Sequence, residues 1–195
     1  MEIETIIKKQ KCEVRLVKDF ISERKAKKYF IKLLDKVSWR KDTIKLFGKT
    51  IPIPRQQAWY GDRGKSYTYS KITLEPLPWF RELKELKCQA EKFSNCCFNS
   101  VLINLYQNGT QYSAWHSDDE KELGINPSIA SISLGETRTF HLRDKKSGET
   151  TKLSLPNASI LIMEGSTQHI YKHQLAKTAK IVGPRINLTF RNVIK

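Results

Sequence analysis

The chain has few cysteines and no long apolar segment, which excludes two broad classes of protein. Its longest apolar run, residues 158–163, is much shorter than the roughly 18 residues that a membrane-spanning helix needs. The four cysteines show no paired metal-ligand spacing, and no disulfide framework is expected. The first ten residues alternate charged and aliphatic side chains and contain no apolar signal core. We therefore expect an intracellular protein without a membrane partner.

Acidic residues are scarce relative to basic ones, with 20 Asp and Glu against 35 Lys and Arg and a net charge of +15. The excess lies at the two ends, since residues 1–50 carry 15 basic and 7 acidic side chains and residues 140–195 carry 10 and 3. Such an excess favours a polyanionic partner, nucleic acid first, because each phosphate contact releases counterions. A lysine-rich surface that serves only solubility remains the alternative.

Two amphipathic helices are expected in the first half of the chain. Ser22 is a suitable N-cap for a helix over residues 23–37, in which apolar side chains recur at helical spacing. A second helix is expected after Pro78 and as far as about Lys92, with Trp79 and Phe80 at the start of its buried stripe.

Turn signals and short apolar runs dominate the rest of the chain. Residues 44–53 predict a hairpin that turns at Gly48, and residues 61–64 predict a second turn. Seven further strands are expected at residues 98–106, 112–116, 129–134, 137–143, 151–155, 158–163 and 185–193. Many short strands without interleaved helices indicate a sandwich or barrel, and the length fits a single domain over residues 1–195.

The last predicted strand alternates between two kinds of side chain. Its polar face carries Arg185, Asn187, Thr189 and Arg191, and its apolar face carries Ile186, Leu188 and Phe190. Two arginines on one face suit a small dianion, although a solvent-exposed strand would show the same pattern. Asn104 and Tyr106 also share one face of their strand and offer an amide and a phenol.

His116 and Asp118 are separated by one residue, which places both side chains on one face of an extended segment. A third ligand from another strand would complete the arrangement of two histidines and one carboxylate that binds non-heme Fe(II). The spacing alone is a weak signal, because a chance His-x-Asp is expected in roughly one such chain in seven.

Several longer motifs follow one another along the chain. They are PRQQAWYG at residues 54–61, YTYS at 67–70, WHSDDE at 115–120, IASISLG at 129–135, LIMEG at 161–165 and RINLTFR at 185–191. In this order they resemble the AlkB-like Fe(II)/2-oxoglutarate dioxygenases over about residues 40–193. The resemblance implies an α+β, mainly β fold: a double-stranded β-helix (jelly roll) core at residues 96–195, with N-terminal helices and nucleotide-recognition hairpins in residues 1–95.

The resemblance also implies three iron ligands, His116, Asp118 and His173. The spacing within the family favours His173 over His169 as the second histidine. His141 is expected to be a strand residue without a metal role.

The resemblance further implies a pocket for 2-oxoglutarate. Arg185 would pair with the distal carboxylate, with help from Tyr106 and Asn104, because the guanidinium fork suits that anion better than an ammonium group does. Arg191 would lie nearer the carboxylate that chelates iron. The implied lining of the pocket is completed by Asn187 and Thr189.

Seven residues are assigned to substrate binding by the resemblance: Phe47, Arg55, Tyr67, Tyr69, Ser70, Asp119 and Glu120. Phe47 at the tip of the expected hairpin would fill the gap left by an extruded base, and Arg55 could contact phosphates. Aromatic faces and a carboxylate suit a cationic methylated base. Asp119 and Glu120 could equally be solvated loop acids.

The implied activity is oxidative demethylation of 1-methyladenine and 3-methylcytosine in DNA. Fe(II) would be the cofactor, 2-oxoglutarate and O2 the co-substrates, and formaldehyde, succinate and CO2 the released products. The same chemistry on RNA bases or a protein side chain is the alternative, and a binding module without catalysis is a third. The expected partner is alkylated DNA, or RNA, bound by a monomer in the nucleus of a eukaryote or the cytoplasm of a bacterium.

Overall fold

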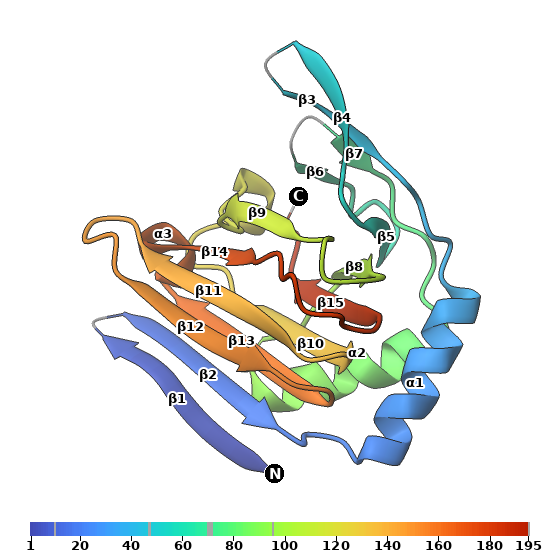
Figure 1. The fold of residues 1–195 in the computed structure, drawn as a ribbon, viewed down its shortest axis with the longest axis horizontal. Helices are drawn as coiled ribbons and strands as arrows, with labels where there is room; N and C mark the ends of the chain where they lie inside the picture. The colour runs from blue at the N-terminus through green and yellow to red at the C-terminus, as the bar shows by residue number, and fades with distance from the viewer. Residues whose placement is uncertain (10, 47, 70–71, 95, 195) are drawn as a thin grey trace.

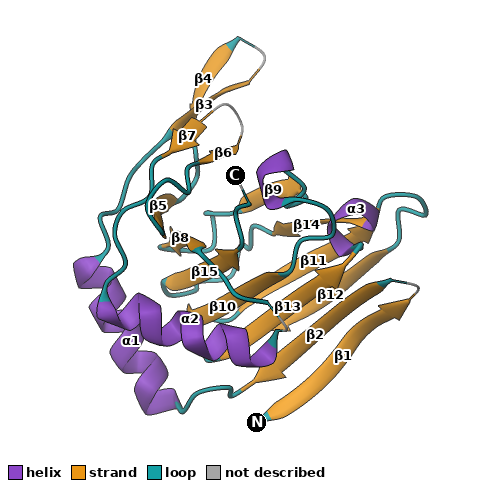
Figure 2. Ribbon diagram, turned by 180° about the vertical axis from the view of Figure 1, so that it is seen from behind, coloured by secondary structure: helices purple, strands orange, loops and turns teal. Residues whose placement is uncertain are grey.

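Two antiparallel sheets face one another, and two helices cover the outer side of the larger sheet (Figures 1 and 2). The computed structural model describes residues 1–9, 11–46, 48–69, 72–94 and 96–194. Two facing antiparallel sheets of this kind form the jelly roll that the sequence resemblance implied.

The larger sheet has seven strands in the order β1-β2-β13-β10-β15-β8-β5. Their bounds are β1 (Glu2–Lys9), β2 (Cys12–Lys18), β13 (Ser159–Gly165), β10 (Ile129–Gly135), β15 (Arg185–Arg191), β8 (Ser100–Tyr106) and β5 (Gln56–Gly61). The smaller sheet has four strands: β12 (Thr150–Leu155), β11 (Arg138–Asp144), β14 (Tyr171–Leu175) and β9 (Ser113–His116).

Two separate hairpins project beyond the facing sheets (Figure 1). One pairs β3 (Thr43–Leu46) with β4 (Lys49–Pro52), as the sequence predicted, and the other pairs β6 (Tyr67–Tyr69) with β7 (Ile72–Leu74). Gly48 adopts a φ of +76° in the turn of the first hairpin, which a residue with a side chain rarely adopts. Phe47, the predicted wedge, lies outside the described residues.

The first 18 residues form a strand pair that the sequence analysis did not predict. β2 joins β13 on one side and β1 on the other, so the larger sheet also takes strands from residues 1–95. A signal for β2 was present, because Cys12, Val14 and Leu16 alternate with polar residues and are buried. The short length of that alternation hid the strand among the charges around it.

Two apolar layers hold the fold together. The first lies between the larger sheet and the helices, where Ile186, Leu188 and Phe190 pack with Leu33 and Leu83. The second lies between the two sheets and is formed by residues such as Leu102, Leu161, Phe140, Leu142 and Leu155. The apolar face predicted for the last strand therefore points to the helices, and its polar face points between the sheets.

The helices are α1 (Glu23–Lys36), α2 (Arg81–Phe93), the short α3 (Thr167–Ile170) and the 3₁₀ turn η1 (Lys121–Leu123). Ser22 caps α1 as predicted, and its Oγ accepts a hydrogen bond from the Lys25 amide at 3.4 Å. The prediction that Trp79 and Phe80 belong to the second helix was wrong. Phe80 is extended at the N-cap, and the Trp79 indole donates to Asp62 at 2.7 Å.

Within the described ranges, every helix is too short or too polar to cross a lipid bilayer.

A buried carboxylate joins α1 to α2. The Glu82 side chain is 4% exposed and accepts hydrogen bonds from Lys32 at 2.9 Å and from Lys36 at 3.0 Å. The bond from Lys32 is the main cause that lowers the pKa of Glu82 to about 2, against the opposing effect of burial. The ionised form therefore stabilises the fold above the ordinary pKa of 4.5, and this contribution is lost as the pH falls towards 2.

We expect Glu82→Gln to lower the free energy of unfolding at pH 7 by about 2 kcal/mol. The substitution weakens two hydrogen bonds between charged groups, but the loss is limited because the half-exposed lysines stay hydrated. Urea unfolding at pH 7 and pH 3 measures this, and the difference from wild type should be smaller at pH 3. The exposed Glu149→Gln serves as the control and should change stability by less than about 0.5 kcal/mol. An equal difference at both pH values would contradict the assignment.

Candidate functional site

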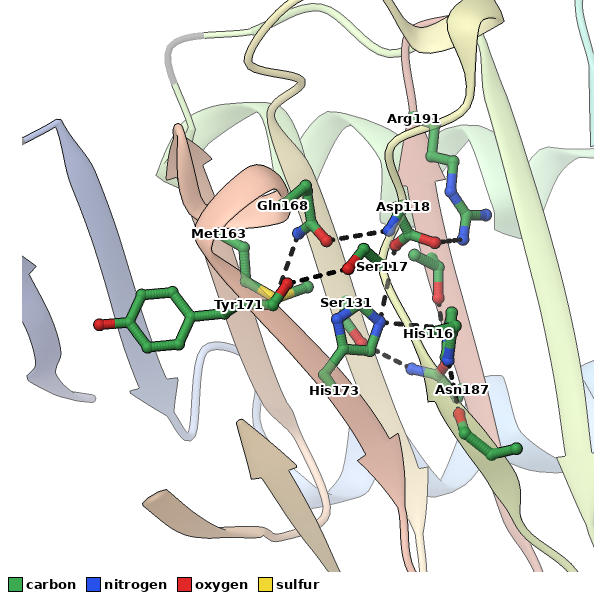
Figure 3. Close-up of polar contacts among 12 residues, drawn as sticks. His116, Ser117, Asp118, Ser131, Met163, Gln168, Tyr171, His173, Asn187 and Arg191 are labelled. Carbon is green, nitrogen blue, oxygen red and sulfur yellow. Dashed lines mark hydrogen bonds and ion pairs between the residues drawn. The ribbon is translucent and has the colours of Figure 1, made fainter. Parts of the chain in front are cut away.

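Three metal-ligating side chains converge between the two sheets (Figure 3). His116 ends β9, Asp118 follows it, and His173 lies opposite His116 in the β9–β14 ladder. One donor atom from each side chain lies within 4.8 Å of the others. The two Nε2 atoms are 3.1 Å apart, and His173 Nε2 is 3.9 Å from Asp118 Oδ2.

Both histidines are kept neutral, which is the protonation state that binds a metal. His116 Nδ1 is 2.7 Å from the Ala114 carbonyl oxygen, which can only accept, so Nδ1 carries a proton. Burial lowers the pKa of His116 and favours the neutral ring, in which Nε2 carries the lone pair. Burial, reinforced by His116, lowers the pKa of His173 to about 3 and keeps this ring neutral. Two neutral imidazoles and one carboxylate form the donor set typical of a non-heme Fe(II) site, so the residues fit that ion.

Asp118 is held in its ionised form by a buried arginine. Burial opposes ionisation, but Arg191 and the two imidazoles outweigh it and keep the pKa of Asp118 below its usual range. Arg191 Nη2 donates to Asp118 Oδ1 at 2.7 Å, and each side chain is 3% exposed. The carboxylate can thus serve as a ligand while it remains paired.

The other two histidines lie apart from this cluster. His141 is on β11, where its Nδ1 is 2.9 Å from Gln174 Nε2. His169 is on α3, and its Nε2 accepts from the Asn126 amide at 3.4 Å.

A polar cavity adjoins the three donors. Its lining includes all the residues assigned to the anion pocket, namely Asn104, Tyr106, Arg185, Asn187, Thr189 and Arg191. These side chains come from the neighbouring strands β8 and β15, where Tyr106 is opposite Arg185 and Asn104 is opposite Asn187.

Arg185 is a buried cation with spare hydrogen-bonding capacity. It is 2% exposed, its Nη2 donates to Ser133 Oγ at 2.8 Å, and its Nε has no hydrogen-bond partner among the described residues. Burial lowers the pKa of Arg185 to about 10, so the group stays charged at neutral pH. No carboxylate in the described part of the chain forms an ion pair with it. A bound anion would compensate this buried charge.

The remaining polar side chains of the cavity are joined to one another. Asn187 Nδ2 donates to Ser131 Oγ at 2.8 Å, and its Oδ1 accepts from Thr189 Oγ1 at 3.0 Å. Asn104 Oδ1 accepts from Arg55 Nε at 2.7 Å. Asn187 and Thr189 therefore hold the shape of the cavity between β10 and β15.

A second cavity of about 340 Å³ opens beside the donors, under the β3–β4 hairpin. Its lining combines Ile44, Ile51 and Pro52 of the hairpin with His116 and Glu120. Two residues predicted to bind the substrate, Arg55 and Glu120, therefore line the same cavity as His116 and Asp118.

The residues assigned to substrate binding occupy different places. Arg55 borders both cavities and is turned inward to Asn104. Glu120 lines the second cavity, whereas Asp119 is exposed and 3.4 Å from Lys145 Nζ. Tyr67 and Tyr69 belong to β6, of which the backbone is described, and Ser70 lies outside the described residues.

Two buried side chains near the site carried no signal in the sequence. Arg138 is 3% exposed and donates to four backbone carbonyls, those of Asn108, Gly109, Gln111 and Ala176. Gln168 is fully buried and accepts from the Asp118 amide at 3.0 Å. Their partners are backbone atoms, which leave no trace in the pattern of side chains.

The sequence profile of the 2OG-Fe(II) oxygenase superfamily matches residues 13–191. The chain belongs to this superfamily. The superfamily is named for 2-oxoglutarate and Fe(II), and the cluster of His116, Asp118 and His173 fits that metal. The AlkB-like resemblance seen in the sequence is confirmed by relatives of that name.

Human alpha-ketoglutarate-dependent dioxygenase alkB homolog 3 is 41% identical over 190 residues, which cover 92% of this oxygenase chain and 66% of the relative. Human DNA oxidative demethylase ALKBH2 is 38% identical over 159 residues, 77% of this chain and 61% of the relative. The chain thus spans just under two thirds of these relatives. A solved structure described as that of OsALKBH1 superimposes with a TM-score of 0.62 at 16% identity, over 95% of this chain and 99% of the other, and shares its fold.

We expect the oxygenase chain to bind Co(II), a spectroscopic substitute for Fe(II), and expect His173→Ala to weaken binding more than about 100-fold, since even outer contacts of a metal site are worth 10–100-fold. Titration followed by visible absorption measures the affinity. His169→Ala is the matched control and should bind like wild type. A stronger effect of His169→Ala than of His173→Ala would reverse the assignment of the ligand.

Proposed function

We propose that the chain is a dioxygenase that oxidatively demethylates N-alkylated bases in DNA, with 1-methyladenine and 3-methylcytosine as its substrates. The observation that carries this proposal is the cluster of His116, Asp118 and His173 next to the buried, uncompensated Arg185. A metal site beside a cavity for a dicarboxylate is what this reaction requires.

His116, Asp118 and His173 would hold the metal ion through one donor atom each. Bound Fe(II) supplies the oxidising chemistry, in which O2 and 2-oxoglutarate convert an N-methyl group to a hydroxymethyl group and leave succinate and CO2. The hydroxymethyl base then loses formaldehyde and is restored.

Arg185 would bind the distal carboxylate of 2-oxoglutarate, because its spare Nε and its charge both lie inside the cavity. The Tyr106 ring lies beside it, with its centre 5.6 Å from the guanidinium carbon. Arg191 would orient the chelating end of the co-substrate through its place against Asp118. Asn104, whose Oδ1 accepts from Arg55 Nε, would help Arg185 to bind the distal carboxylate.

The cavity under the β3–β4 hairpin would receive the extruded base. Its apolar residues Ile44, Ile51 and Pro52 suit a flat ring, and the Glu120 carboxylate suits the positive charge of a methylated base. The cavity borders His116 and Asp118, so a methyl group placed there would face the metal.

The names of several relatives favour DNA as the substrate, and the charge of the chain favours a nucleic acid of either kind. Relatives from human, mouse and cattle bear the name DNA oxidative demethylase, and the chain carries a net charge of +15. RNA shares the polyanionic backbone and is the second candidate, whereas no observation favours a protein side chain. We further propose that the protein acts as a monomer and in the compartment that holds its nucleic acid.

The activity is tested with Fe(II), ascorbate, 2-oxoglutarate and matched single-stranded and duplex DNA oligonucleotides that contain 1-methyladenine. We expect loss of one methyl mass that depends on 2-oxoglutarate. Succinate formation without any change in either oligonucleotide would contradict DNA as the substrate, and a matched RNA oligonucleotide would then be tested.

We expect Arg185→Lys to raise the KM for 2-oxoglutarate about 10- to 100-fold, because a bidentate contact to a carboxylate is replaced by a single point charge. Steady-state assays over a range of 2-oxoglutarate concentrations measure this. The control is Arg81→Lys on the exposed side of α2, for which no change is expected. An unchanged KM in Arg185→Lys would place the distal carboxylate elsewhere.

A further inference from the structure

The segment that carries Asp118 has no place in a sheet. β9 ends at His116, and residues 117–120 run on to η1 without strand pairing. The position of Asp118 therefore depends on local contacts. Two of them lead to the same short stretch of chain: the Asp118 amide donates to Gln168 Oε1 at 3.0 Å, and Ser117 Oγ donates to the Tyr171 carbonyl at 2.9 Å (Figure 3).

Gln168 has a single orientation that satisfies this arrangement. A backbone amide can only donate, so the side-chain oxygen of Gln168 must face Asp118 and its amide nitrogen must face away. That nitrogen lies 3.6 Å from Met163 Sδ. The side chain is fully buried, where an amide without a hydrogen-bond partner would be unfavourable. The Gln168 side chain is thus oriented to accept the hydrogen bond from the Asp118 amide.

The α3 turn that carries Gln168 is itself fixed from two sides. Lys145 Nζ donates to the Gln168 carbonyl at 2.9 Å, and the Lys145 amide donates to the Ile170 carbonyl at 2.9 Å. On the other side, the Ser166 amide donates to the Lys11 carbonyl at 3.0 Å. Gly165 has a φ of +63°, and a Cβ at this position would collide with that Lys11 oxygen.

The Asp118 carboxylate has to reach two groups that come from different sheets. One oxygen is 2.7 Å from Arg191 Nη2 on β15, and the other is 3.9 Å from His173 Nε2 on β14. A small displacement of the Asp118 backbone would lengthen one of these distances. Metal sites are sensitive to such displacements, because their geometry depends on the groups that orient the ligands.

We propose that Gln168 is a positioning residue for the metal site: its side-chain oxygen holds the Asp118 backbone where the carboxylate can bind the ion together with His116 and His173. Ser117, through the Tyr171 carbonyl, is the second point of attachment. This inference rests on the metal site of the proposed function and adds to it a residue that does not touch the ion.

The test is a Co(II) titration of the full chain, followed by visible absorption. Gln168→Met keeps the length of the side chain but removes the oxygen, and it should weaken Co(II) binding about 10- to 100-fold and change the visible spectrum. Gln168→Glu restores an oxygen and should bind Co(II) more tightly than Gln168→Met. Gln174→Met on β14 is the matched control, because its amide contacts His141 instead, and it should match wild type.

Wild-type affinity and spectrum in a folded Gln168→Met variant, verified by far-ultraviolet circular dichroism, would overturn the inference and leave the metal site intact. Absence of Co(II) binding by the wild-type chain would overturn the metal site and this inference together. If Gln168→Met does not fold, Ser117→Ala carries the test: weaker binding and an altered spectrum support the arrangement, and unchanged binding overturns it.

Discussion

The buried ion pair between Asp118 and Arg191 is the interaction on which the rest of the site depends. Arg191 comes from the last strand of the larger sheet, and Asp118 comes from the segment that leaves the smaller sheet. Burial of a charge is costly, and an opposite charge within hydrogen-bond distance lowers that cost. The pair therefore ties the segment that carries Asp118 to the larger sheet, and it keeps the carboxylate ionised.

Much of this arrangement follows from patterns that are local in the sequence. In β15 a period of two residues places Arg185 and Arg191 on one face and Leu188 on the other, and the helices and the smaller sheet supply the two environments. His116 and Asp118 are likewise close in sequence. His173 lies far from both in the sequence, and only the resemblance to a family implied that it is a ligand. The helix that Ser22 caps was predictable because capping is a matter of a few neighbouring residues.

The features that could not be predicted depend on distant backbone atoms. Arg138 binds carbonyls from two loops, and Gln168 binds the amide of a residue 50 positions earlier. The pattern of side chains along the sequence does not indicate which distant backbone atoms these two residues will contact. The inward turn of Arg55 towards Asn104 depends in the same way on the pairing of β5 with β8. The strand pair at the N-terminus was missed for another reason, since the alternation of Cys12, Val14 and Leu16 with polar residues in β2 is short.

The contact between Lys11 and Gly165 gives the first strands a role that their exposed surfaces would not suggest. The Lys11 carbonyl occupies the space that a side chain at position 165 would need, and it accepts the amide that begins α3. The variation permitted at position 165 is therefore set by the course of the backbone 154 residues earlier, although neither residue offers a group to the metal or to an anion. A side chain at position 165 would thus require the backbone at Lys11 to move, and with it the start of α3.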